Sequence, residues 1–109
     1  MQYILQMLKI IEIKNSRVKV FKPQSDSDLE GLEKELALPD GASEVLIDLK
    51  GVSLVGNGFI RLLQRIRMQD PALQRKIRLL NPGPLAEKAL RMAGLDNAFE
   101  IRKIYPTAW

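Results

Sequence analysis

The stretch from residue 45 to residue 68 shows the clearest pattern of hydrophobic and polar positions in the chain. It begins with a short apolar run that is broken by a single aspartate: Val45, Leu46, Ile47, Asp48 and Leu49. Branched residues in a run of this length predict a strand covered on both faces. After a turn at 56–58, apolar residues recur with the spacing of one helix face: Phe59, Leu62, Leu63 and Ile66. We therefore expect a buried strand followed by an amphipathic helix over 58–69.

The turn between them is Gly56-Asn57-Gly58, where glycine allows the backbone to take a positive φ angle at little cost. The side-chain oxygen of Asn57 can accept the first free N–H groups of a helix, which predicts Asn57 as the N-cap. The opposite helix face carries Arg61, Arg65 and Met68 at i, i+4 and i+7. This face is either an ordinary solvated surface or a surface that docks a partner.

The remaining segments alternate between strand and helix patterns. We expect strands over 3–13, 17–22, 77–80 and 97–103, because each is rich in apolar residues or alternates with period two. Helices are expected from Ser25 or Ser27 to about residue 37, with Gly31 weakening the helix, and after the Asn81-Pro82-Gly83-Pro84 segment. Asp70-Pro71 ends the helix of 58–69, and Gly94 ends the last helix.

This order predicts an α/β fold in a single domain spanning residues 1–109. Strands that alternate with helices pair in parallel through right-handed crossovers, while the first strand makes the sheet mixed. The expected architecture is therefore a mixed, mostly parallel sheet of about five strands with helices largely on one side. The first ten residues are either an ordered strand or a dimerising arm, so a homodimer stays open.

Composition argues against an enzyme. The 109 residues include neither cysteine nor histidine, so the usual general base and the usual zinc ligands are missing. Carboxylates do not cluster in the sequence. We therefore expect a non-catalytic protein with no metal and no cofactor, and the absence of cysteine fits a reducing cytoplasm.

The charge pattern gives little evidence that the protein binds nucleic acid. A net charge of +4 is mild, and the basic residues are spread along the chain. The densest cluster, Arg75-Lys76-x-Arg78, also fits a strand with Ile77 and Leu79 inward and Lys76 and Arg78 outward. No apolar stretch reaches the length of a membrane span, and the N-terminus lacks the features of a signal peptide. We expect no nucleic-acid partner and no embedding in a membrane.

Two stretches resemble the signatures of STAS domains, the fold of bacterial anti-sigma factor antagonists (SpoIIAA-like). Residues 46–58, LIDLKGVSLVGNG, are similar to apolar-Asp-Leu-Ser-Gly-Val-Thr, two apolar residues and Asp-Ser-Ser-Gly. Residues 89–99, ALRMAGLDNAF, match Leu, three residues, Gly-Leu, three residues, Phe. The resemblance covers roughly residues 44–103, whereas the N-terminal third matches only in element order.

The sequence departs from the signature where the family is regulated. The resemblance implies a phosphorylated serine at the position of Asn57, preceded by an aspartate where this chain has Gly56 and followed by a serine where it has Gly58. Asn57 has no hydroxyl to receive phosphate, and its neutral amide does not imitate phosphoserine. We expect no release of a partner by phosphorylation at residue 57.

The resemblance implies a regulatory protein-binding module whose partner resembles an anti-sigma factor, itself a kinase-like ATPase. The expected contact residues are Gly56, Asn57, Gly58, Arg61, Arg65 and Met68. Two alternatives stay open: a soluble STAS subunit of an ABC, lipid or anion transporter complex, and a small-ligand sensor. Asp48 fits a structural role better than a catalytic one. Tyr105 and Trp109 either contact a partner or cover a sheet edge.

Overall fold

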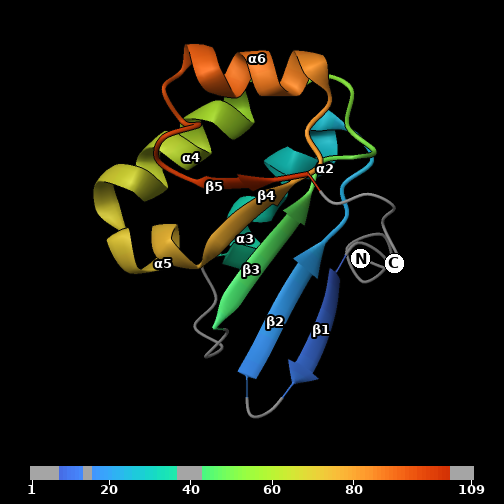
Figure 1. Ribbon diagram of the computed structural model, residues 1–109, viewed down its shortest axis with the longest axis vertical. Helices are drawn as coiled ribbons and strands as arrows, with labels where there is room; N and C mark the ends of the chain where they lie inside the picture. The colour runs from blue at the N-terminus through green and yellow to red at the C-terminus, as the bar shows by residue number, and fades with distance from the viewer. Residues whose placement is uncertain (1–7, 14–15, 37–42, 104–109) are drawn as a thin grey trace.

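The centre of the protein is a five-stranded mixed sheet. The structure, a computed structural model, describes residues 8–13, 16–36 and 43–103. The strands lie side by side in chain order (Figure 1): β1 (Leu8–Ile13), β2 (Ser16–Phe21), β3 (Glu44–Asp48), β4 (Ile77–Leu80) and β5 (Glu100–Arg102). β1 pairs antiparallel with β2, and every other pair is parallel. The predicted mixed, mostly parallel sheet is confirmed.

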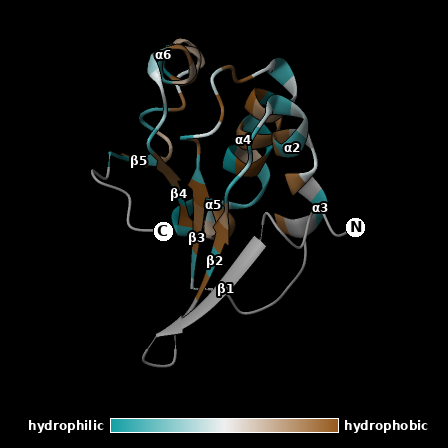
Figure 2. Cartoon of the chain, turned by 90° about the vertical axis from the view of Figure 1, so that its right-hand side faces the viewer, coloured by the Kyte–Doolittle hydropathy of each residue, from teal (hydrophilic) through white to brown (hydrophobic). Residues whose placement is uncertain are grey.

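The helices follow from this strand order. Right-handed connections between neighbouring parallel strands all cross the same face of the sheet. Accordingly α2 (Asp26–Glu30), α3 (Leu32–Leu36) and α4 (Asn57–Gln69) lie on one side, as Figure 2 shows. α5 (Pro71–Lys76) leads into β4, and α6 (Pro84–Met92) lies across the end of the molecule toward which the parallel strands point (Figure 1).

The core lies between the sheet and these helices. Phe21, Ile47 and Leu79 are neighbours in register across β2, β3 and β4, and none of their side chains is exposed. The predicted apolar face of α4 packs onto this row and is buried throughout: Phe59, Leu62, Leu63 and Ile66. The helix prediction for this stretch is therefore confirmed, including the face that it buries.

Several predicted boundaries need correction. β1 begins at Leu8 among the described residues, so residues 3–7 of the predicted first strand lie outside them. The helix predicted to start at Ser25 or Ser27 is two short helices, because the chain turns at Gly31. Ser25 is its N-cap, and its Oγ accepts a hydrogen bond from the Asp28 N–H at 3.3 Å. The last strand is shorter than 97–103, since residues 93–98 stay in turns.

The sequence prediction missed α5. Asp70 and Pro71 end α4 as expected, but they also start a second helix. Asp70 Oδ1 accepts a hydrogen bond from the Leu73 N–H at 3.1 Å, and proline suits the first helical turn. Lys76 therefore belongs to α5 and not to the strand, whereas Ile77 and Leu79 are buried as the alternation predicts.

The start of α6 also differs from expectation in one respect. Gly83, and not Asn81, is its N-cap, and Pro84 occupies the first position. Asn81 takes a left-handed backbone with φ 52°, a conformation that asparagine tolerates better than most residues. The helix ends as predicted at Gly94, whose φ is 72°; the Leu95 N–H then bonds the Leu90 carbonyl at 2.9 Å.

The buried face of α4 should dominate the stability of the domain. Leu63 is fully buried, and its neighbour Gln64 is exposed on the same helix. Leu63→Ala should lower the free energy of unfolding by about 2–5 kcal/mol through lost burial and a residual cavity. Gln64→Ala is the matched control and should change it by less than about 0.5 kcal/mol. Urea denaturation measures both, and equal effects would contradict the assigned core.

Candidate functional site

The connection from β3 to α4 holds the predicted partner-binding loop. Asp48 ends β3 with a buried side chain, and its Oδ1 accepts a hydrogen bond from the Lys50 N–H at 3.0 Å. The Val52 N–H bonds the Leu49 carbonyl at 3.0 Å and closes the turn. Asp48 thus stabilises the turn, which agrees with the structural role predicted for this residue.

Two valines fix the loop to the core. Val52 and Val55 are buried in the main hydrophobic cluster, whereas Leu54 between them is 63% exposed. The loop is therefore held on both sides of a leucine that points to solvent. An exposed leucine on a held loop is a feature expected of a contact surface, although single exposed apolar residues are common.

The N-terminus of α4 differs from the prediction. Gly56 is the N-cap, with φ −88° and ψ 177°, and no side chain caps the helix from that position. Asn57 is the first helical residue and is exposed, so its predicted capping role is wrong. Positive φ is not used here either, since Gly56 is extended and Gly58 lies within the helix. The amide of Asn57 is instead presented to solvent.

A carboxylate from another element binds the backbone at the start of α4. Asp26 in the first turn of α2 accepts a hydrogen bond through its Oδ1 from the Gly56 N–H at 2.7 Å. The two residues are separated by 30 positions in the sequence. Sequence reasoning missed Asp26 because no local pattern records such a contact. The only local sign is a glycine at the end of a loop that leads into a long helix.

The outer face of α4 is one continuous exposed stripe. Asn57, Gly58, Arg61, Arg65 and Met68 are all exposed, Met68 to 83%, and helical spacing puts residues 57, 61, 65 and 68 on one side. α4 contains three arginines and no acidic residue. The structure thus brings five of the predicted residues to one exposed surface, with Gly56 half-buried at its start.

A shallow cavity adjoins the far end of this stripe. It measures about 210 Å³ and lies between α3, α4 and α5. Its lining is mainly apolar, with Arg65 at its edge: Leu36, Leu62, Arg65, Ile66, Gln69, Asp70 and Leu73. The sequence pattern could not predict it, because it depends on α5 and on how α3 meets α4.

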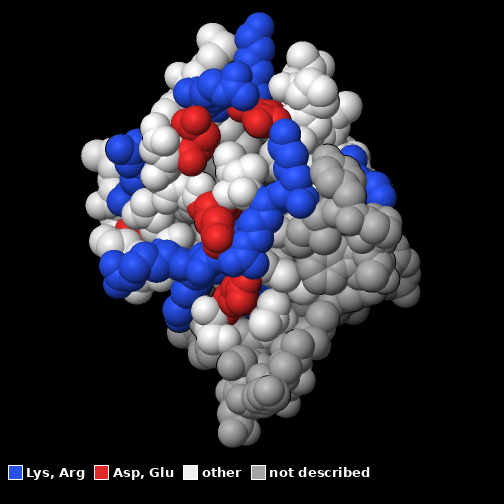
Figure 3. Space-filling view, in the orientation of Figure 1, with Lys and Arg blue, Asp and Glu red and all other residues white. Residues whose placement is uncertain are grey.

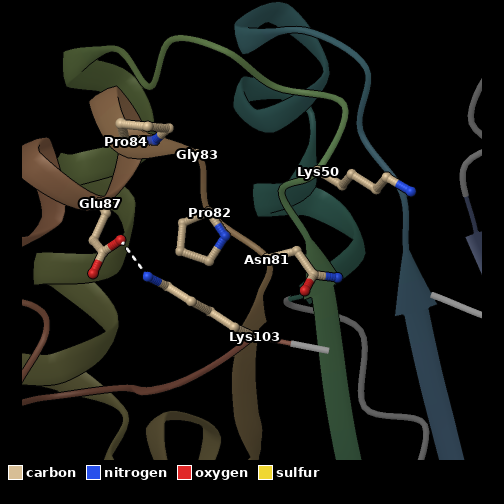
Figure 4. Close-up of a pocket in the computed structure, with 7 residues that line it drawn as sticks. All are labelled: Lys50, Asn81, Pro82, Gly83, Pro84, Glu87 and Lys103. Atoms are coloured by element: carbon tan, nitrogen blue, oxygen red, sulfur yellow. Dashed lines mark ion pairs between the residues drawn. The ribbon is translucent and has the colours of Figure 1, made fainter. Parts of the chain in front are cut away.

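A second cavity of about 320 Å³ lies at the carboxyl ends of β3, β4 and β5. Lys103 points across it to Glu87 of α6, with 3.0 Å between Nζ and Oε2 (Figure 4). The Lys50 side chain points away from this pair. The hydrogen bond from Lys103 holds the pKa of Glu87 below its ordinary value, and the charges of Lys103 and Arg91 act in the same direction. The two charged groups that face each other in this cavity neutralise one another.

The charges on the sheet face opposite the helices are also mixed. Arg78 on β4 and Glu100 on β5 are directly opposite in register and form an ion pair, and Arg102 Nη2 lies 3.1 Å from Glu100 Oε2. Figure 3 shows red and blue groups alternating over the visible described part of this side. The cluster at 75–78 is therefore divided between α5 and a paired strand position, and it forms no uniform basic patch.

Other kinds of site receive no support from the described part of the chain. Residues 8–13, 16–36 and 43–103 contain no group of three acidic side chains that could hold a metal ion. Within the same ranges, no helix is long and apolar enough to cross a membrane. Tyr105 and Trp109 lie outside the described residues.

Comparison with known proteins identifies the fold. No protein-family model and no curated protein matches the sequence, but solved structures do match. A Thermotoga maritima protein described as a candidate anti-sigma factor antagonist has a TM-score of 0.65 at 14% identity, covering 91% of this chain and 88% of its own. The chain has the STAS fold.

Two further STAS-fold structures agree. An anti-sigma factor antagonist (STAS) domain protein from Planctomyces limnophilus gives a TM-score of 0.61 at 20% identity, covering 89% of this chain and 90% of its own. An anti-sigma factor antagonist from Mycobacterium paratuberculosis gives 0.62 at 20% identity, with 93% and 86% covered. At these identities the likeness is one of fold alone.

The Glu87–Lys103 pair predicts how the stability of this protein depends on pH. The pKa of Glu87 is lower in the folded than in the unfolded chain, so its contribution is present above the ordinary glutamate pKa and is lost as pH falls through the folded value. Glu87→Gln should therefore be less stable than the wild type at neutral pH and equal to it in strong acid.

Urea denaturation at about pH 7 and about pH 3 measures this difference, the lower value lying below the ordinary glutamate pKa. Lys103→Gln is the partner variant, and adding it to Glu87→Gln should cause little further loss because the pair is already broken. A Glu87→Gln effect of the same size at both pH values would contradict the assigned pairing.

Proposed function

We propose that this STAS-fold chain is a non-catalytic regulatory module that binds a protein partner, in the manner of an anti-sigma factor antagonist. One observation carries the proposal most. The loop and the outer face of α4 form a single exposed surface whose underside is fixed in the core by Val52, Val55 and the buried face of α4. A surface that is held rigidly loses little conformational entropy when a partner docks.

The charge of the surface indicates the chemistry of the partner. Arg61 and Arg65 lie along the stripe, and α4 itself contains no carboxylate. Leu54 before the helix and Met68 near its end are exposed apolar side chains. The matching surface on a partner is acidic with apolar contacts, since complementary charge speeds association and apolar burial holds the complex.

Within this function the partner is an anti-sigma factor-like, kinase-like ATPase in the cytoplasm. The module acts by competing for that partner and performs no chemistry itself. Support comes from the STAS fold that the chain shares with anti-sigma factor antagonists and from the position of the stripe directly after the signature loop. If the partner were a transporter subunit, the bound protein would differ but the binding surface would be the same.

Binding by this module is independent of phosphorylation at the loop. Asn57 is exposed at the position where the signature has serine, and it lacks the hydroxyl that a kinase needs. Its neutral amide adds no negative charge to the stripe. The module is therefore in its binding-competent form without dephosphorylation.

The test of the docking surface is an affinity pull-down of the tagged full chain from its native cells, with proteins identified by mass spectrometry. Arg61→Glu/Arg65→Glu should reduce recovery of the specific partner by at least about tenfold, because like charges would then face each other. Arg67→Glu/Arg75→Glu is the matched control, since it makes the same change in net charge with exposed residues outside the stripe.

Equal recovery by both charge-reversed baits would exclude the α4 stripe as the interface. Recovery of a kinase-like ATPase would support the sigma-regulation version, and recovery of transporter subunits would contradict it.

Phosphatase treatment offers a separate prediction about regulation. Treating the lysate and the bait with phosphatase should leave partner recovery unchanged, because residue 57 carries no phosphate to remove. Mass spectrometry of the native protein should likewise find no phosphate on residues 53–58. Phosphate on Ser53 that weakens binding would show that another hydroxyl in the loop has taken over the switch.

A further inference from the structure

Two helices of this protein begin with a glycine N-cap in nearly the same conformation. Gly56 before α4 has φ −88° and ψ 177°, and Gly83 before α6 has φ −71° and ψ 175°. Both are extended conformations that any residue adopts. Neither glycine is therefore required by its own backbone angles.

The space around the two glycines is different. A Cβ added at Gly83 would meet no atom within 4 Å, whereas a Cβ at Gly56 would overlap Asp26 Oδ2 and lie 2.9 Å from its Cγ. A contact that short cannot persist, so a side chain at residue 56 must displace the Asp26 carboxylate. Glycine at 56 is needed because that carboxylate occupies the place beside it.

Asp26 is itself held firmly by the start of α2. Ser25 caps the helix, and Asp28 Oδ2 accepts a hydrogen bond from the Gln24 N–H at 2.7 Å. The Asp28 side chain is buried, as is Leu29 in the core cluster. The backbone around Asp26 is therefore held in place by contacts other than the one with Gly56.

The same segment approaches the loop at a second point. A Cβ at Gly51 would lie 2.8 Å from Gln24 Oε1, so the Gln24 side chain packs closely over the first part of the loop. α2 also packs against α4, beside its beginning in the view of Figure 1. Residues 24–26 therefore contact the loop both near its start and at its junction with α4.

From these contacts we propose that Asp26 is the positioning residue of the docking surface. Its carboxylate binds the N–H of the N-cap residue of α4 from another helix, supplies the negative group that favours a helix N-terminus, and fixes the junction between the loop and the exposed stripe. This assignment rests on the proposed function, in which the loop and stripe bind a partner. Asp26 and Gly56 form a matched pair, since the carboxylate binds the Gly56 N–H and occupies the space that a side chain at residue 56 would need.

The first test measures amide hydrogen exchange of the free protein. In Asp26→Ala, exchange at residues 54–58 should accelerate by about tenfold, the size expected for loss of a hydrogen bond to a charged group, while exchange in β3 stays unchanged. Gly56→Ala should produce the same pattern by displacing the carboxylate. Asp26→Ala/Gly56→Ala should add nothing further, because the same hydrogen bond has already been lost.

Gly83→Ala is the matched control, because it measures the ordinary cost of replacing a glycine cap by alanine where there is free space. In Gly83→Ala, amide exchange in the first turn of α6 should accelerate much less than exchange in the first turn of α4 does in Gly56→Ala. Asp26→Ala/Gly56→Asp provides the rescue: it places a carboxylate at the helix's own N-cap, where it accepts from the N–H groups of residues 58 and 59, and should restore slow exchange there. Additive effects of Asp26→Ala and Gly56→Ala, or unchanged exchange at 54–58 in Asp26→Ala, would overturn the proposal.

Partner binding gives the functional readout. Asp26→Ala should reduce recovery in the pull-down several-fold although β3 exchange shows an intact core, and Asp26→Ala/Gly56→Asp should recover it. Equal recovery by Asp26→Ala and wild type would contradict a positioning role. Because exchange is measured without a partner, failure to recover any partner would contradict the proposed binding function and not the exchange result.

Discussion

Burial of β3 is the constraint on which the rest of the structure depends. This strand pairs on both sides, with β2 and β4, and its Val45 and Ile47 lie in the core cluster. Leu49 continues the apolar sequence beyond the strand and is fully buried. The chain must therefore leave β3 at the edge where β4 and β5 also end, and the connection to α4 emerges there. Because the next crossover is right-handed, α4 returns over the same face that α2 and α3 cover.

The parts of the fold that local pattern controls were predictable from the sequence. Phe59, Leu62, Leu63 and Ile66 repeat at helical spacing and are buried as that spacing requires. The mixed, mostly parallel sheet of about five strands follows from alternation of strand and helix patterns. The predicted stripe of Arg61, Arg65 and Met68 is exposed because it lies opposite the apolar face. For these features the spacing of apolar residues along the chain is enough to determine which side faces the core.

Features that depend on contacts distant in sequence were not predictable in this way. α5 is short and has no buried residue, so it has no apolar period; Asp70 capping and the Gln74 side chain, whose Nε2 donates to the Ala98 carbonyl at 2.9 Å, hold it in place. The capping of α4 is a stronger case. Asparagine is an excellent cap in isolation, yet the N-cap is one residue earlier at Gly56, whose own N–H is bound by Asp26.

That contact connects two features of the loop that look unrelated in the sequence. A side chain at residue 56 and the Asp26 carboxylate compete for one volume, so glycine at the position where the STAS signature has aspartate and a carboxylate arriving from α2 are parts of one arrangement. With Gly56 as the N-cap, Asn57 is the first helical residue and its amide remains at the surface. The result is a loop whose geometry is set by a fixed contact with α2, which gives a physical basis for the proposed binding surface and for the proposal that it does not rely on a modifiable serine.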